Sequence, residues 1–258
     1  MAVDTRQPVA PAARHAARGR GARFPGWGLV ALTVVGLGLT AFMVSAYLPP
    51  DITTSRVPMH GDQLHFWLLV AHIGTAAVAT VTGFGQFWPW LRRRYPMVHR
   101  WTGRVYFFGG VFPSVVLAVP VALLSQFGAS YMLALLAVDA VWLGTAVAGY
   151  RTIRQRRYAE HRRWMIRNFA TLLSSLASRL WQVALMLMVV PQLHWSAYGG
   201  DSRALTHDIA SASIWVSLGV NLLIAELYIQ RRLTRRRVPT RVPPQPTAAD
   251  RAPVPSSR

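Results

Sequence analysis

Residues 130–150 read SYMLALLAVDAVWLGTAVAGY, and residues 151–163 directly after them read RTIRQRRYAEHRR. The first stretch is long and apolar enough to cross the roughly 30 Å hydrocarbon core of a bilayer as a helix. The second stretch holds six arginines, whose charges belong in water or among lipid headgroups. This pattern predicts a membrane-spanning helix that ends in a loop at one membrane surface.

The same alternation recurs along the whole chain of 258 residues. Of these residues 52% are hydrophobic and only 14% are charged, against about 25% charged in a typical soluble domain. We therefore predict an all-α fold, an integral membrane helical bundle with six transmembrane helices. The predicted spans are 27–48, 65–90, 104–124, 130–150, 164–190 and 209–230.

The first span ends in Val44-Ser45-Ala46, which is similar to a signal-peptidase site. Cleavage there is the alternative to a retained helix. The apolar run of this span is longer than the 7–15 residues of a typical signal segment. We therefore expect the first span to be retained.

The arginines predict the orientation of the spans. The chain has 28 arginines, no lysine and a formal charge of +19, and 24 of the arginines fall in 1–26, 91–104, 151–163 and 231–258. Short loops rich in basic residues stay in the cytoplasm, so both termini are expected there and the protein in the plasma membrane. The charge is thus a topology signal, which also suits anionic lipids at the cytoplasmic face, and nucleic-acid binding is not expected.

The two ends of the chain differ from the apolar region between them. Residues 1–26 and 231–258 are rich in arginine together with alanine, glycine or proline, and they contain few large apolar side chains. Such segments cannot build a core, so we expect a disordered basic N-terminal tail and a disordered C-terminal tail. The transmembrane domain is then 27–230.

Ionisable side chains inside the spans mark a candidate site, because a charge at membrane depth needs a partner. From the span ends, Asp139 lies roughly 13 Å and Arg179 roughly 16 Å below the outer surface, which predicts an ion pair between them. His72 lies at roughly 10 Å. A role in packing and a role in substrate or proton handling both remain open. The candidate pocket in the outer half of the bundle comprises His72, Asp139, Ser178, Arg179 and Gln182. In the sixth span, Glu226 is expected to reach Arg231 or the inner interface.

Two His-Arg pairs lie at the cytoplasmic mouths of the third and fifth spans. His99 and His161 match in depth, as the two axial ligands of a haem b would. The alternative is that both contact lipid phosphate at the headgroup level. The arginines available for haem propionates or lipid phosphates are Arg100, Arg104, Arg162 and Arg167. The chain has no cysteine, which excludes thiolate metal sites, and no metal site or enzyme motif stands out.

These features together resemble a family of bacterial predicted membrane proteins, domain of unknown function 2306, over about residues 65–190. The matching residues are His72, Gly83-Phe84-Gly85-Gln86-Phe87, His99-Arg100 with Gly103-Arg104 and Tyr106, and His161-Arg162-Arg163-Trp164-Met165-Ile166-Arg167 followed by Arg179. The resemblance implies a four-helix membrane core with flanking helices, and it implies no particular activity. We expect a binding, transport or scaffold protein, with a haem-binding membrane redox protein as the alternative.

Overall fold

The computed structural model describes residues 26–57, 61–192 and 198–234, and the regular structure in these ranges is helical throughout. Six helices in the described ranges are long and apolar enough to cross a membrane, which confirms the predicted fold class. They are α1 (Gly26–Ser45), α2 (Gln63–Phe87), a third span over Pro96–Leu123, α6 (Ala129–Arg154), α7 (Tyr158–Val189) and α8 (Ser202–Thr234). Short helical turns, η1 (Ile52–Thr54) and η3 (Val190–Gln192), follow α1 and α7.

The predicted tails lie almost entirely outside the described residues. Gly26 already starts α1, and α8 continues through Thr234, a few residues beyond the predicted end of the sixth span. The fifth span also begins earlier than predicted, at Tyr158. Hydropathy alone misses these ends because the additional turns contain arginines, which lower the local hydropathy.

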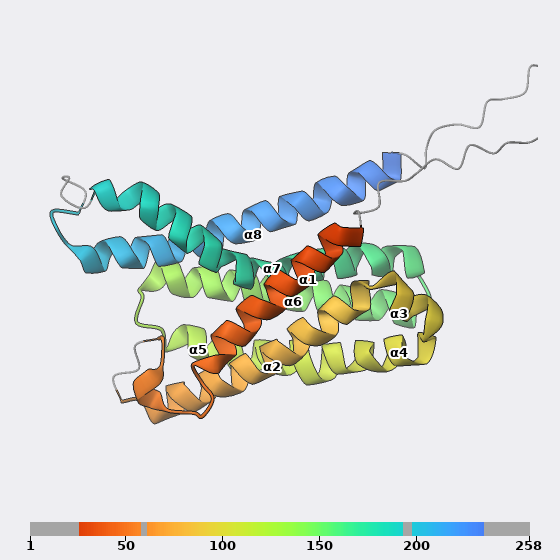
Figure 1. Cartoon of the computed structure of the whole chain (residues 1–258), viewed down its shortest axis with the longest axis horizontal. Coiled ribbons are helices and arrows are strands. Elements are labelled where there is room, and N and C mark those ends of the chain that lie inside the picture. The colour runs from red at the N-terminus through yellow and green to blue at the C-terminus, as the bar shows by residue number, and fades with distance from the viewer. Residues whose placement is uncertain (1–25, 58–60, 193–197, 235–258) are drawn as a thin grey trace, which may run out of the picture.

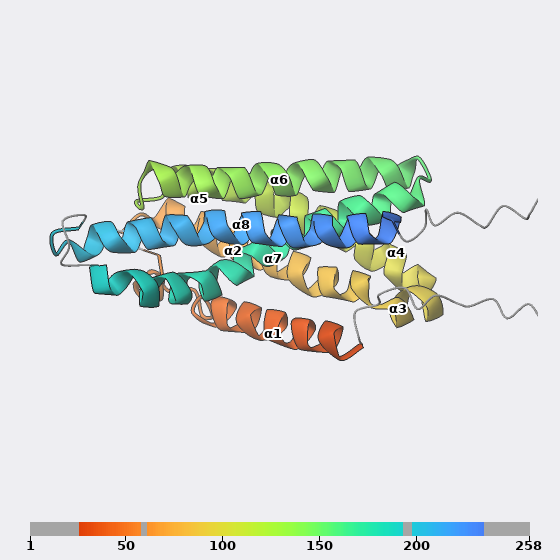
Figure 2. The same cartoon turned by 90° about the horizontal axis from the view of Figure 1, so that it is seen from above.

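The spans run along the long axis of the molecule, and α1 crosses the bundle obliquely (Figures 1 and 2). A short helix, α3 (Pro89–Arg94), lies at one end together with the turn between α6 and α7. The first residues of α1 and the last residues of α8 point to this end as well. We call it the arginine-rich end, and the end with the α7–α8 connection the opposite end.

The third span changes its helical geometry part-way. It begins as α4 (Pro96–Arg104), widens into the π-helix η2 (Val105–Val111) and continues as α5 (Phe112–Leu123). The π-helical turns lie directly before Pro113, which has no backbone N–H to donate. The span therefore passes this proline as one continuous helix.

The core lies where α2, η2, α6 and α7 meet. Its aromatic members include Phe84, Tyr106, Trp142 and Phe169. The Phe84 and Phe169 rings meet edge to face, with centroids 5.1 Å apart. This packing fixes the helices whose polar side chains form the candidate site.

Candidate functional site

His72 is held between α2 and α5. Its Nδ1 lies 3.0 Å from the Ser114 carbonyl oxygen and 3.2 Å from Ser114 Oγ. The carbonyl can only accept, so Nδ1 carries the proton in this contact and Nε2 keeps a lone pair. Ser114 is fully buried, which places this contact inside the bundle.

Asp139 is a buried carboxylate on α6, with 8% of its surface exposed. It shares a helix face with Ala146, two turns later, and Ala146 belongs to the core. Within the described residues its carboxylate takes part in no ion pair or hydrogen bond. Asp139 therefore faces the bundle interior as an uncompensated acid.

Ring contacts between η2 and α6 set the register of the third span against α6. The rings of Phe107 and Phe108 pack against Tyr150, with centroids 5.7 and 5.5 Å apart. The third span and α6 are antiparallel, so residues about seven positions beyond Phe107 lie opposite residues about seven positions before Tyr150. This register places the His72–Ser114 contact and Asp139 in neighbouring layers of the bundle.

The register of α6 against α7 follows from two hydrogen bonds. His161 Nδ1 lies 2.8 Å from the Gly149 carbonyl, and Asn168 Nδ2 donates to Thr145 Oγ1 over 2.9 Å. In this antiparallel pair, Asp139 lies opposite a residue about six positions beyond Asn168. That position is close to Ser174.

Arg179 lies farther toward the opposite end of the bundle, so the predicted Asp139–Arg179 ion pair is wrong. Arg179 is exposed and acts electrostatically on Tyr131, near the start of α6, rather than on Asp139. The two charges are offset by about 10 Å along the helices. The prediction counted depth from the ends of the predicted spans, but α7 is longer than its span. The half of α7 nearer the opposite end also leans away from α6 (Figures 1 and 2).

The predicted pocket residues on α7 differ in their exposure. Ser178 is buried, Gln182 is half-buried, and Arg179 between them is exposed. Ser178 lies one turn beyond Ser174, whose carbonyl accepts a hydrogen bond from Ser217 Oγ of α8 over 2.7 Å. Of the predicted set, His72 and Asp139 thus lie in neighbouring layers, and the residues of α7 lie farther out.

At the arginine-rich end, His161 acts electrostatically on His99. The His161 contact with the Gly149 carbonyl uses Nδ1, and its Nε2 has no hydrogen-bond partner among the described residues. His99 Nδ1 is buried and likewise makes no hydrogen bond within the described part of the chain. The His99 carbonyl accepts a hydrogen bond from Gln86 Nε2 over 3.2 Å, which ties α4 to the end of α2. A histidine that donates Nδ1–H to a backbone carbonyl is oriented as metal-bound histidines usually are.

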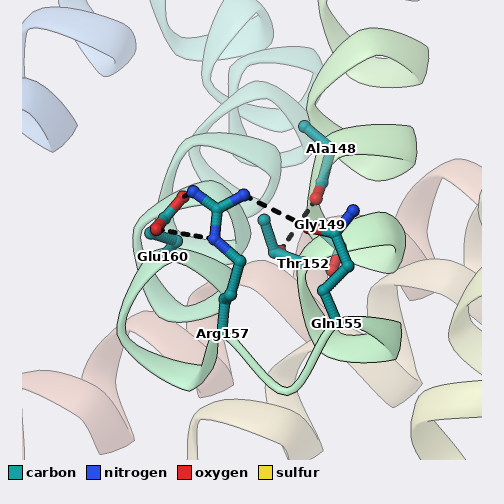
Figure 3. A network of polar contacts seen from close by, with 6 residues as sticks. All are labelled: Ala148, Gly149, Thr152, Gln155, Arg157 and Glu160. Carbon is teal, nitrogen blue, oxygen red and sulfur yellow. Dashed lines mark hydrogen bonds and ion pairs between the residues drawn. The ribbon is translucent and has the colours of Figure 1, made fainter.

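The turn that carries His161 is held by polar contacts (Figure 3). Arg157 pairs with Glu160, with Nε 2.9 Å from Oε1, and its Nη1 lies 3.2 Å from Gln155 Oε1. The Thr152 hydroxyl donates to the carbonyls of Ala148 and Gly149, the same Gly149 that His161 contacts. The beginning of α7 is therefore fixed relative to the end of α6.

The arginines assigned to propionates or phosphates behave differently from one another. Arg100 Nε donates to the Pro96 carbonyl over 3.3 Å, and Arg104 lies over the Trp101 ring at 4.7 Å. Both side chains are exposed, as is that of Arg162.

Arg167 forms an ion pair with Glu226. Its Nη2 lies 2.7 Å from Glu226 Oε2 on α8, and its Nε lies 3.1 Å from the same oxygen. The expectation that Glu226 reaches Arg231 missed this pair. Both residues lie a few positions inside the arginine-rich ends of their spans, so an argument from equal depth would have found the pair.

Sequence reasoning also missed a buried network around Asn168. Asn168 is fully buried, accepts a hydrogen bond from the Tyr106 hydroxyl and donates to the Trp142 carbonyl over 2.8 Å. The signal for it was an amide side chain within the first part of the fifth span. Within the described part of the chain, no three histidine or acidic side chains form a group suited to a metal ion.

The model of a known family matches residues 69–229, which is more than half of the chain. The chain belongs to the family of predicted membrane proteins called domain of unknown function 2306. The match begins within α2 and ends within α8, so the family region includes the sixth span, beyond the predicted limit of about residue 190. No curated protein and no solved structure matches this member of the family.

Proposed function

We propose that this multi-pass membrane protein binds or passes a small polar solute through the outer half of its bundle, without catalysing a reaction. The observation that carries the proposal is Asp139, a buried acid that forms no ion pair with any basic side chain of the described residues. An ionisable residue at membrane depth is costly, and such residues usually serve a substrate, an ion or a proton.

The surrounding side chains support a solute with more than one polar group. Asp139 suits a cationic or hydrogen-bond-donating group, and His72 in the neighbouring layer adds a ring nitrogen. Arg179, exposed about 10 Å farther out, suits an anionic group. Ser178 and Gln182 lie on the helix segment that carries Arg179, which completes the proposed binding set.

The absence of cysteine from the chain allows a direct test by cysteine accessibility. We expect a charged, water-soluble thiol reagent to modify the Asp139→Cys and Gln182→Cys variants in membranes. The control is Val116→Cys, because Val116 is 71% exposed on α5, where lipid surrounds the helix and thiols are unreactive. Absence of modification at both candidate positions, with an outer-loop Ser55→Cys variant reacting normally, would rule out a water-accessible site.

A second candidate function is haem binding by His99 and His161, which the contact of His161 Nδ1 with the Gly149 carbonyl favours, because it orients the ring as metal-bound histidines usually are. A bound haem b would add electron transfer, and the exposed Arg100, Arg104 and Arg162 are the proposed partners of its propionates. The test is the visible spectrum of the purified full-length protein after expression with added haem. A Soret band that both His99→Ala and His161→Ala abolish, and that His207→Ala retains, supports the proposal, whereas absence of a band removes it.

We further propose that the arginine-rich end faces the cytoplasm of a bacterium, with both termini there and anionic lipids around it. The described ends of α1 and α8 point to the same end of the bundle as the arginine loops, which supports this orientation. A reporter enzyme that works only in the cytoplasm should be active when it is fused after residue 258. Activity of a periplasm-specific reporter enzyme fused at the same position would contradict the orientation.

A further inference from the structure

The arginine-rich end has a hollow of about 510 Å³ lined by Pro89, Trp90, Arg93 and Arg94. This volume lies within the range of small-molecule sites. We propose that the hollow binds the headgroup of one anionic phospholipid. The inference deepens the proposed contact with anionic lipids and rests on it, since it assigns that contact to one site.

The local sequence explains why the hollow forms. Pro89 starts α3 two residues after α2 ends, and Pro96 starts α4 two residues after α3 ends. The chain therefore reverses direction through two turns within a few residues, and the six-residue helix α3 lies at the end of the bundle (Figure 1). We place this end at the level of the lipid headgroups. A side chain on α3 meets lipid headgroups rather than acyl chains.

The arginines of α3 have different roles. Arg92 acts electrostatically on His99, on the bundle side of the helix. Arg93 and Arg94 line the hollow, and the described residues contain no ion pair for either of them. Each guanidinium group offers the hydrogen-bond geometry that a phosphate accepts. The charge of the hollow therefore matches a phosphodiester.

An aromatic wall makes the hollow suit a lipid better than a free ion. The Trp90 ring is 62% exposed and meets Tyr95 edge to face, with centroids 5.2 Å apart. Tryptophan and tyrosine favour the headgroup level, where their rings contact the glycerol and upper acyl region. Arginine and tryptophan together select a molecule with an anionic head and an apolar body.

The experiment measures how the full-length protein in detergent retains added phosphatidylglycerol, by native mass spectrometry. We expect an Arg93→Gln/Arg94→Gln variant to bind roughly 30-fold more weakly than wild type, and Trp90→Ala to bind a few-fold more weakly. The matched control is Arg151→Gln/Arg154→Gln, which removes the same charge from exposed positions at the same end. Unchanged melting of all variants in lipid-free detergent checks that they fold.

The outcomes separate the site from general attraction. Equal losses in the two double variants would overturn the site while leaving the general lipid proposal intact. Equal retention of phosphatidylglycerol and phosphatidylcholine by the wild type would overturn both. Competition by millimolar inorganic phosphate, with no effect of Trp90→Ala, would show that the hollow takes the free ion and would overturn the lipid assignment.

Discussion

Arg167 of α7 and Glu226 of α8 form an ion pair, with Nη2 2.7 Å from Oε2, near the arginine-rich end of the bundle. The Arg167 guanidinium also lies over the Trp164 ring at 5.0 Å, and Gln230 donates a hydrogen bond to the other Glu226 oxygen over 2.8 Å. The pair therefore ties α8 to the helix that carries most of the candidate site.

The coupling between Arg167 and Glu226 can be measured with a double-mutant cycle. The two side chains are 27% and 40% exposed, so solvent screens the pair and we expect a coupling of about 0.5–1 kcal/mol. The cycle uses Arg167→Gln, Glu226→Gln and the double variant, with unfolding followed by titration with sodium dodecyl sulfate. Strict additivity of the two single effects would show that the pair contributes nothing to stability.

Asp139 and Arg179 should behave as independent sites, because the structure separates them. The Asp139→Asn change removes a buried charge and should leave the free energy of unfolding unchanged or raise it. Arg179→Gln should change it by less than about 0.5 kcal/mol.

The double variant of Asp139 and Arg179 tests that separation. Its effect should equal the sum of the single effects within about 0.5 kcal/mol, by the same titration. If Asp139→Asn loses stability and the double variant recovers it, the result would support the Asp139–Arg179 ion pair that the sequence predicted.

Removal of the Tyr106 hydroxyl should destabilise the core. In Tyr106→Phe the buried Asn168 Oδ1 loses its donor, which should cost about 1–3 kcal/mol. Tyr150→Phe is the matched control, since Tyr150 packs against the same aromatic group through its ring and is only partly buried. Similar losses for the two variants would mean that the hydrogen bond to Asn168 is not what matters.

Gly110 should tolerate no side chain, whereas its neighbour Gly109 should tolerate a methyl group. A Cβ on Gly110 would lie 2.8 Å from the Cα and Cβ atoms of Ala79, while one on Gly109 would meet only Val105 at 3.5 Å and Val78 at 3.9 Å. We expect Gly110→Ala to cost about 1–3 kcal/mol in unfolding free energy and Gly109→Ala much less.

A compensating change checks the cause of the Gly110 effect. Ala79→Gly removes the Cβ that a new methyl group would meet, so it should recover part of the loss in Gly110→Ala. If Gly110→Ala and Gly109→Ala cost the same, the close approach of η2 and α2 is not limiting.

The amino-acid sequence determined the class of the protein, the number of its spans and its family. The apolar runs meet the bilayer one helix at a time, so length and hydropathy suffice to find them. The electrostatic influence of His161 on His99 was also within reach, because each residue lies near the start of its own helix and depth is counted from that start.

The tertiary structure decided which polar groups meet inside the bundle. Asp139 and Arg179 have similar estimated depths, but the length and tilt of α7 separate them along the bundle. Arg167 instead forms an ion pair with Glu226, on a helix that is distant in the sequence. Likewise the contact between His72 and Ser114 depends on how α2 packs against a span whose turns widen before Pro113. Insertion depth follows from single helices, but the register and tilt of neighbouring helices follow from side-chain packing between them, which one-dimensional hydropathy does not contain.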